Sequence, residues 1–161
     1  MDAIATPTPT QRDAELAGPA RVAFRFGDRR LFARIICALR GGDSAHCEVA
    51  GAWAEDGTYE CVSASWLDGG VRGKRMPLPA AKWRIYELAS PNSPAAWLHS
   101  RAGAGYDLLG LLGIVFPPVG QSRQRWFCSE AVADVLGLSE PHIFDLRTLE
   151  STCARFGRRV Q

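Results

Sequence analysis

Short stretches in the first half of the chain alternate apolar and polar residues with the period of two that is typical of β-strands. The predicted strands cover residues 21–26, 46–53, 58–65, 70–78 and 83–89. The turn Glu55-Asp56-Gly57 is a hairpin signal between the second and third of them. Because the last four strands follow one another closely, we expect an antiparallel meander.

Residues 31–40 and the second half of the chain instead have apolar residues at helical spacing. Helices are predicted at residues 31–40, from 94 to about 102, after 107 up to 116, from about 126 to 136 and from 146 to 156. Ser93 and Asp145 can cap two of these helices, and Gly137 and Gly157 follow two helix ends. Strands followed by helices predict an α+β fold, with an antiparallel sheet of about four to six strands packed against helices.

The chain has 161 residues, of which 47% are apolar and 22% charged, and this fits one globular domain. Residues 1–20 carry a Thr-Pro repeat and few large apolar groups, so we expect a flexible tail before a domain at residues 21–161. The net charge of +2 is too small to favour nucleic acid as a partner. The apolar stretches are too short for a membrane span, and no secretory signal is visible.

Five scattered cysteines without CxxC spacing indicate neither a disulfide framework nor a zinc ribbon. A metal site made of His46, Cys47 and Cys61 is disfavoured, because adjacent strand residues point to opposite faces of a sheet. The glycine-rich stretches lack the spacing of phosphate-binding loops. We therefore expect neither a metal nor a cofactor.

Cys128 is the thiol best placed for covalent chemistry. It stands at the start of a predicted helix, where the partial positive charge of the helix N-terminus lowers the pKa of a thiol. The free N–H groups of the first helical turn can also hold an oxyanion. The alternative is that Cys128 is simply a small buried apolar residue, the usual fate of a free cysteine.

A nucleophilic thiol needs a base from another element, and His46 begins a predicted strand. Glu48 shares the face of His46, and the next strand offers Ser63 as a polar neighbour. The alternative is a half-exposed strand histidine without a catalytic role.

Several short motifs occur along the chain in a suggestive order. They are Ser44-Ala45-His46-Cys47-Glu48, Ser63-Ala64-Ser65, Gly69-Gly70-Val71-Arg72, Gly103-Ala104-Gly105-Tyr106-Asp107 and Trp126-Phe127-Cys128-Ser129-Glu130. From about residue 21 to residue 151 the chain resembles the circularly permuted branch of the NlpC-type papain-like cysteine hydrolases. That branch includes lecithin:retinol acyltransferase-like enzymes and small proteins encoded in phage and prophage tail-gene clusters.

The resemblance implies a papain-like fold in which Cys128 is the nucleophile and His46 the base. In the permuted branch the histidine strand precedes the cysteine helix, as it does here. The family's third polar residue falls on Ser63, where many relatives carry His or Glu, so Glu48 remains an alternative orienter. We expect Cys128 and His46 to face each other at about 3 to 4.5 Å, with Ser63 contacting the imidazole and Glu48 adding negative charge nearby.

Four further residues are candidates for substrate binding. Tyr106 and Asp107 lie in a matching motif and can line the cleft, although Asp107 can equally cap the helix that follows. Arg125, in the loop before Cys128, can hold a substrate carboxylate or be solvated. Trp66 falls in a turn near the expected cleft, but most tryptophans serve packing.

The expected function is that of a thiol-dependent hydrolase, a peptidase or amidase acting on peptidoglycan peptide bonds and associated with phage or prophage tails. The alternatives are an acyltransferase or thioesterase-like enzyme, and a non-catalytic tail or assembly component that keeps the fold. Ser63 at the third position favours the last of these. The expected partners are a peptide or peptidoglycan substrate and phage tail proteins, and the expected location is cytoplasmic or virion-associated.

Overall fold

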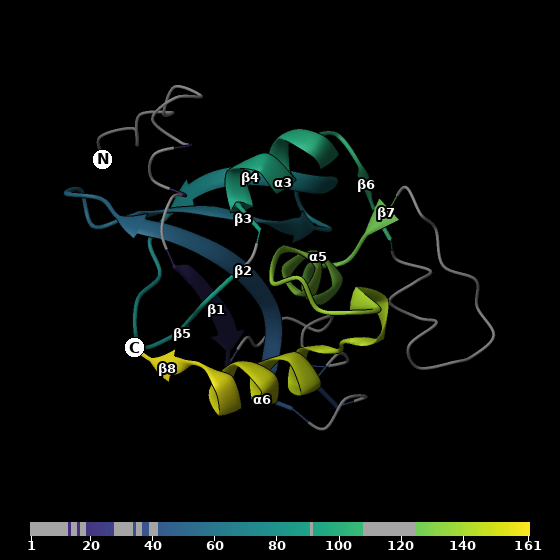
Figure 1. The fold of residues 1–161 in the computed structure, drawn as a ribbon. Helices are drawn as coiled ribbons and strands as arrows, with labels where there is room; N and C mark the ends of the chain where they lie inside the picture. The colour runs from purple at the N-terminus through teal and green to yellow at the C-terminus, as the bar shows by residue number, and fades with distance from the viewer. Residues whose placement is uncertain are drawn as a thin grey trace.

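The computed structural model describes residues 19–27, 42–90, 92–107 and 125–161, together with positions 13, 16, 34, 37 and 38. Among these residues the fold is α+β, as predicted, with three α-helices and one eight-stranded sheet that curls around them (Figure 1). The strands are β1 (Ala20–Phe26), β2 (Ser44–Trp53), β3 (Tyr59–Ser65), β4 (Gly70–Met76), β5 (Trp83–Leu88), β6 (Gly105–Tyr106), β7 (Arg125–Trp126) and β8 (Arg158–Arg159). The helices are α3 (Pro94–Arg101), α5 (Cys128–Val135) and α6 (Leu146–Phe156), with a 3-10 turn, η1, at Pro141–Ile143.

The strand order corrects two of the predictions. The order is β7-β6-β4-β3-β2-β1-β5-β8, and every pairing is antiparallel except that of β6 with β7. The expected four to six strands are exceeded because β6, β7 and β8 have two residues each, too few to show a period of two. The expected meander stops at β4, since β5 lies beside β1 at the other side of the sheet.

The two faces of the sheet bury two separate apolar clusters. The larger cluster contains Val49 and Val62 from the sheet together with residues of α5 and α6, which cover that face. The smaller cluster, with Ala50 and Ile85 among its members, lies on the opposite face. Alternation along β2 therefore sends consecutive residues to different cores.

Two helix boundaries follow the capping residues that the sequence predicts. The Ser93 hydroxyl accepts a hydrogen bond from the backbone N–H of Ala96 at 3.3 Å, and the Asp145 carboxylate accepts one from Thr148 at 2.7 Å. Each bond satisfies a donor that the first helical turn leaves free. The helix α5 begins differently, because its capping residue is Phe127, which has no side-chain oxygen.

Gly70 allows β6 to approach β4 closely. Its φ of 153° suits glycine, and a Cβ there would lie 2.0 Å from the carbonyl oxygen of Ala104. Gly70 pairs with Gly105, and the N–H of Val71 donates to the same Ala104 carbonyl at 2.8 Å. This close approach anchors β6, which in turn pairs with β7 immediately before α5.

The predicted helices at residues 31–40 and after residue 107, and the predicted tail at residues 1–20, fall almost entirely outside the described residues. Of the helices that are described, none combines the length and the apolarity that crossing a membrane requires.

Candidate active site

Cys128 is the first residue of α5, and its sulfur meets β2 at the point where β2 separates from β3. The β2–β3 register runs from the Val49–Val62 pair toward Trp53. Before Val49, the hydroxyl of Ser63 donates to the carbonyl of Cys47 at 2.8 Å, and Cys47 lies near the sulfur of Cys128, whose pKa it helps to lower. The start of α5 thus lies beside β2 near the end of its paired stretch with β3.

The surroundings of Cys128 favour its thiolate. Its pKa is held well below the ordinary value, chiefly by a hydrogen bond from the Cys47 thiol and also by contact with His46, although burial acts in the opposite direction. The N-terminus of α5 adds a favourable field at the same atom. Cys128 is buried, with 4% of the residue exposed.

His46 lies on β2 and carries the matching positive charge. Burial alone would lower its pKa, but the neighbouring Glu48 carboxylate and the contact with Cys128 raise it to about 10. The ring Nε2 lies 2.8 Å from Glu48 Oε1, which leaves Nδ1 as the nitrogen that can meet the sulfur. The two shifts, a lowered pKa for the Cys128 thiol and a raised pKa for the His46 imidazole, both favour the thiolate–imidazolium form of the pair.

Glu48 is completely buried and is held as a carboxylate by two cations. Arg72 donates to both of its oxygens, Nη1 to Oε2 and Nη2 to Oε1, at 2.6 Å each. Although burial raises the pKa of Glu48, the bonds from Arg72 and the charge of His46 lower it to about 2. Such a fork-to-carboxylate pair fixes the orientation of the acid as well as its charge.

Arg72 is in turn fixed by Asp68 in the turn between β3 and β4. Its Nε donates to Asp68 Oδ2 at 2.9 Å, and Lys74 binds the other oxygen of Asp68 at 3.2 Å. Charges of alternating sign therefore run from the surface inward, from Asp68 through Arg72, Glu48 and His46 to Cys128. Sequence reasoning assigned a role only to the inner three of these residues, Glu48, His46 and Cys128.

The expectation that Ser63 contacts the imidazole is wrong. Its hydroxyl donates to backbone carbonyls, and the contact to Nε2 is made by Glu48. Ser63 instead lies opposite Arg72 in the β3–β4 ladder, next to the Val62–Val49 pair. Because its side chain is small, the long side chain of Arg72 can cross β3 above it and reach Glu48.

Of the four residues expected to bind substrate, Tyr106 is the one whose proximity to Cys128 is clearest. Burial of the Tyr106 phenol raises its pKa, and the neighbouring charge of Cys128 raises it further. The ring of Trp66 stands edge-on to Tyr106 at 6.0 Å between centroids, and Trp66 is 54% exposed. Trp66 and Tyr106 thus form an aromatic pair, and Tyr106 is the member that lies near Cys128.

The other two candidates are less directly placed. Asp107 is buried, and its backbone N–H donates to the carbonyl of Trp126 at 3.0 Å, so its segment supports the approach to α5. Arg125 is exposed on β7 and pairs with Gly105.

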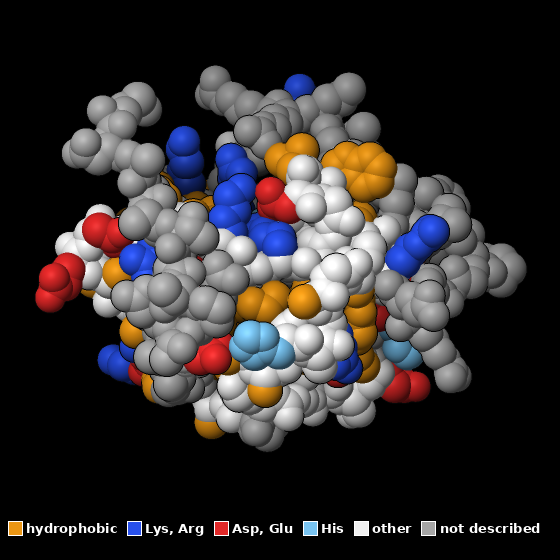
Figure 2. All heavy atoms as spheres, turned by 90° about the horizontal axis from the view of Figure 1, so that it is seen from above, with side chains coloured by type: hydrophobic (Ala, Val, Ile, Leu, Met, Phe, Trp, Pro, Cys, Tyr) orange, Lys and Arg blue, Asp and Glu red, His pale blue; other side chains and the backbone are white. Residues whose placement is uncertain are grey.

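Seen from above α3 and β4, the surface has exposed hydrophobic side chains beside a group of Lys and Arg side chains (Figure 2).

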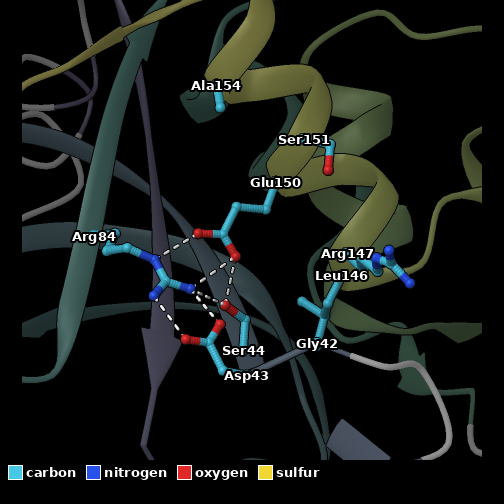
Figure 3. A pocket seen from close by; sticks show the side chains of 9 residues that line it. All are labelled: Gly42, Asp43, Ser44, Arg84, Leu146, Arg147, Glu150, Ser151 and Ala154. Carbon is cyan, nitrogen blue, oxygen red and sulfur yellow. Dashed lines mark hydrogen bonds and ion pairs between the residues drawn. The ribbon is translucent and has the colours of Figure 1, made fainter.

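A cavity of about 480 Å³ lies elsewhere, between the start of β2, β5 and α6. Its charged lining is paired internally: Arg84 binds Glu150 at 2.6 Å and Asp43 at 2.9 Å, and Ser44 donates to Glu150 (Figure 3). These bonds tie α6 to the residues just before His46. Because these charged groups bind one another, we interpret the cluster as a structural contact between α6 and the sheet rather than as a second reactive centre.

Searches for related proteins add nothing to this geometry: no family model, curated protein or solved structure matches the chain. Within the described residues, no group of three or more His, Cys, Asp or Glu side chains is arranged to hold a metal ion. What the arrangement can do chemically follows from Cys128, His46 and Glu48 themselves.

Proposed function

We propose that this protein is a thiol-dependent hydrolase of amide bonds, with Cys128 as nucleophile and His46 as base and acid. One observation carries the proposal: the sulfur of Cys128 contacts an imidazole whose other side is held by a buried, Arg72-bound carboxylate. A thiol packed merely as an apolar group needs no such partner. Thiol, imidazole and orienting acid in this order are the parts that nucleophilic catalysis requires.

The reaction follows from the charges at the site. The Cys128 thiolate attacks the carbonyl carbon of the substrate, and the first N–H groups of α5 stabilise the negative charge that develops on the carbonyl oxygen. The His46 imidazolium gives its proton to the leaving amine, and the acyl group stays on the sulfur. His46, now neutral, takes a proton from water, which attacks the thioester and releases the acid.

The resemblance to permuted NlpC-type hydrolases supports a papain-like architecture and a peptidoglycan peptide as substrate. The helix-borne Cys128 follows the strand-borne His46 along the chain, in the order of that branch. The aromatic pair of Tyr106 and Trp66 gives the substrate an apolar surface near Cys128. An association with phage or prophage tails, in the cytoplasm or the virion, belongs to the same proposal.

The non-catalytic alternative drew its support from Ser63 at the third position. That support weakens because Glu48 supplies a stronger acceptor at the ring than any hydroxyl. An acyltransferase or thioesterase-like activity uses the same thiolate, so substrate tests must include esters and thioesters beside amides.

The first test measures alkylation of Cys128 by iodoacetamide between pH 5 and 9, followed by mass spectrometry of peptides. At pH 6 an ordinary cysteine is only about 0.3% thiolate, whereas Cys128 is expected to react rapidly. His46→Ala should slow the reaction at pH 6 at least about tenfold, because the imidazolium no longer stabilises the thiolate. Equal rates in both proteins would contradict the proposed pair.

The second test measures release of new amino groups from purified peptidoglycan. Cys128→Ala should abolish release, whereas Cys61→Ala, which removes a buried thiol on the other face of the sheet, should retain it. Activity on an acyl thioester but not on peptidoglycan would favour the acyltransferase alternative. Rapid alkylation without activity on amide, ester or thioester substrates would favour the non-catalytic one.

A further inference from the structure

Arg72 lies on β4, which β3 separates from β2, yet its side chain reaches the acid that holds the His46 imidazole. It stands opposite Ser63 in the β3–β4 ladder, and its guanidinium binds Glu48 on β2. The side chain of Arg72 is only 15% exposed and that of Glu48 is 0% exposed, so the contact lies inside the protein. Taking two charged groups out of water is costly, and a site that does so gains orientation as well as charge.

We propose that Arg72, tethered by Asp68, is a positioning residue that fixes the His46 ring through Glu48. The proposal rests on the proposed function, in which His46 acts as base and acid. It adds that the imidazole depends on the planar geometry of the Arg72 guanidinium, and not only on its charge.

The oxygen Oε1 of Glu48 meets two donor groups at once. It lies 2.8 Å from His46 Nε2 and accepts a hydrogen bond from Arg72 Nη2 at 2.6 Å. Arg72 Nη1 holds the other oxygen, Oε2, at 2.6 Å. Because one planar fork binds both oxygens, the carboxylate cannot rotate without breaking a hydrogen bond. Oε1 therefore stays directed at the ring.

The acceptor at Nε2 determines which nitrogen of His46 exchanges a proton during the reaction. A carboxylate that accepts from Nε2 keeps a proton on that nitrogen when the ring is neutral. The lone pair is then on Nδ1, the nitrogen left to meet the thiol or the leaving group. If Glu48 could rotate, the ring could turn or adopt its other tautomer, and the base would be lost for part of the time.

Asp68 holds a third donor of the Arg72 guanidinium. Arg72 Nε donates to Asp68 Oδ2 at 2.9 Å, so the plane of the fork is fixed from the turn as well as from Glu48. Lys74 binds the other oxygen of Asp68 at 3.2 Å. A lysine at position 72 would keep the positive charge, but it lacks the fork that binds two oxygens of one carboxylate side by side.

The test is NMR of the His46 ring in the full chain, labelled with isotope-enriched histidine. The chain has three histidines, and the exposed His99 and His142 are assigned by replacing each with glutamine. In the wild type we expect a low-field proton on His46 Nε2 that exchanges slowly with water. Arg72→Lys should speed this exchange at least about tenfold, because Glu48 is no longer held against the ring.

Arg75→Lys is the matched control. Arg75 lies three residues further along β4, on the opposite face of the strand. Its side chain is also 15% exposed, and it pairs with Asp56 at 3.6 Å. This variant should keep the wild-type exchange rate. Equal exchange in wild type and Arg72→Lys, or the same acceleration in Arg75→Lys, would overturn the proposal.

A second pair of variants decides the question if circular dichroism shows that Arg72→Lys is unfolded. Asp68→Asn retains both hydrogen bonds between Arg72 and Glu48 and removes the charge of the tether. Asp56→Asn makes the same change at the partner of Arg75. We expect exchange at His46 to be about threefold faster in Asp68→Asn and unchanged in Asp56→Asn. An unchanged rate in Asp68→Asn would exclude the tether.

Kinetics separate this proposal from the proposed function. On an amide that the wild type hydrolyses, Arg72→Lys should lower kcat about tenfold and leave KM nearly unchanged, because Arg72 acts through Glu48 and not on the substrate. A raised KM with an unchanged kcat would assign Arg72 to substrate binding and overturn the positioning role. The NMR comparison needs no substrate, so the expected NMR difference in a protein without hydrolytic activity would support the positioning and contradict the proposed function.

Discussion

Replacing Arg72 by methionine should destabilise the protein far more than the same change at its neighbour Lys74. Both side chains bind Asp68, but only Arg72 also binds the buried carboxylate of Glu48. Methionine keeps most of the apolar stem and removes the charge. The pair of variants therefore isolates the contact with Glu48.

The magnitude follows from two independent arguments. Lowering the pKa of Glu48 from 4.5 to about 2 corresponds to about 3 kcal/mol of stability. Removing one partner of a buried ion pair costs about 3–5 kcal/mol in general. Lys74 is 53% exposed, and its pair with Asp68 is worth at most about 1 kcal/mol.

Urea unfolding at pH 7, followed by circular dichroism, measures both losses. We expect a decrease of about 3–5 kcal/mol in the free energy of unfolding for Arg72→Met, a large share of the roughly 5–15 kcal/mol of an ordinary domain. Lys74→Met should lose less than about 1 kcal/mol. Equal losses in the two variants would refute the idea that Arg72 holds Glu48 ionised.

Three further results are expected. In wild type, stability should be lost as pH falls through about 2, because the lowered pKa of Glu48 contributes stability above pH 4.5, and urea unfolding across this range measures it. Glu48→Gln should lower the pKa of His46 from about 10 and slow alkylation of Cys128 at pH 6 about tenfold, and an unchanged rate would exclude Glu48 as the orienter. Gly70→Ala should cost more stability than Gly69→Ala in urea unfolding, since a Cβ at Gly70 meets a carbonyl oxygen at 2.0 Å and one at Gly69 meets open space.

The five longer strands and the three described helices could be predicted because their signals are local. A period of two marks β1 to β5, and a side-chain cap marks α3 at Ser93 and α6 at Asp145. The position of β5 beside β1 could not be predicted in this way. Alternation shows that a segment is a strand but does not show which strand it pairs with.

The inner site could be predicted only in part. Cys128 and His46 were found from a helix start, a strand and a resemblance, but Ser63 was preferred over Glu48 as the partner of the ring. Residues two apart on a strand are about 6.5 Å apart, which suggested that Glu48 had to fold back. The structure shows that two long side chains leaning together span this distance.

Arg72 had a signal in the sequence that was not used. Ser65 and Gly70 flank the turn between β3 and β4 and pair with each other, so counting outward along the hairpin places Arg72 opposite Ser63. A long basic residue opposite a small one, beside a strand that carries a carboxylate, can reach across to it. The register of a predicted hairpin can therefore point to the partner of a charged residue, such as Arg72, to which the motif alone assigns no role.

The end of the β2–β3 pairing explains why His46, Cys47 and Glu48 of β2 all lie at or beside the Cys128 site. Beyond the last β2–β3 pair, the carbonyl of Cys47 accepts from Ser63, and Cys47 lies near the Cys128 sulfur, whose pKa it helps to lower. Unsatisfied buried backbone groups are costly, so the end of the ladder requires such partners. Once α5 supplies the sulfur there, the residues on either side of Cys47 lie beside it, and a change that restored ordinary β2–β3 pairing would displace the nucleophile.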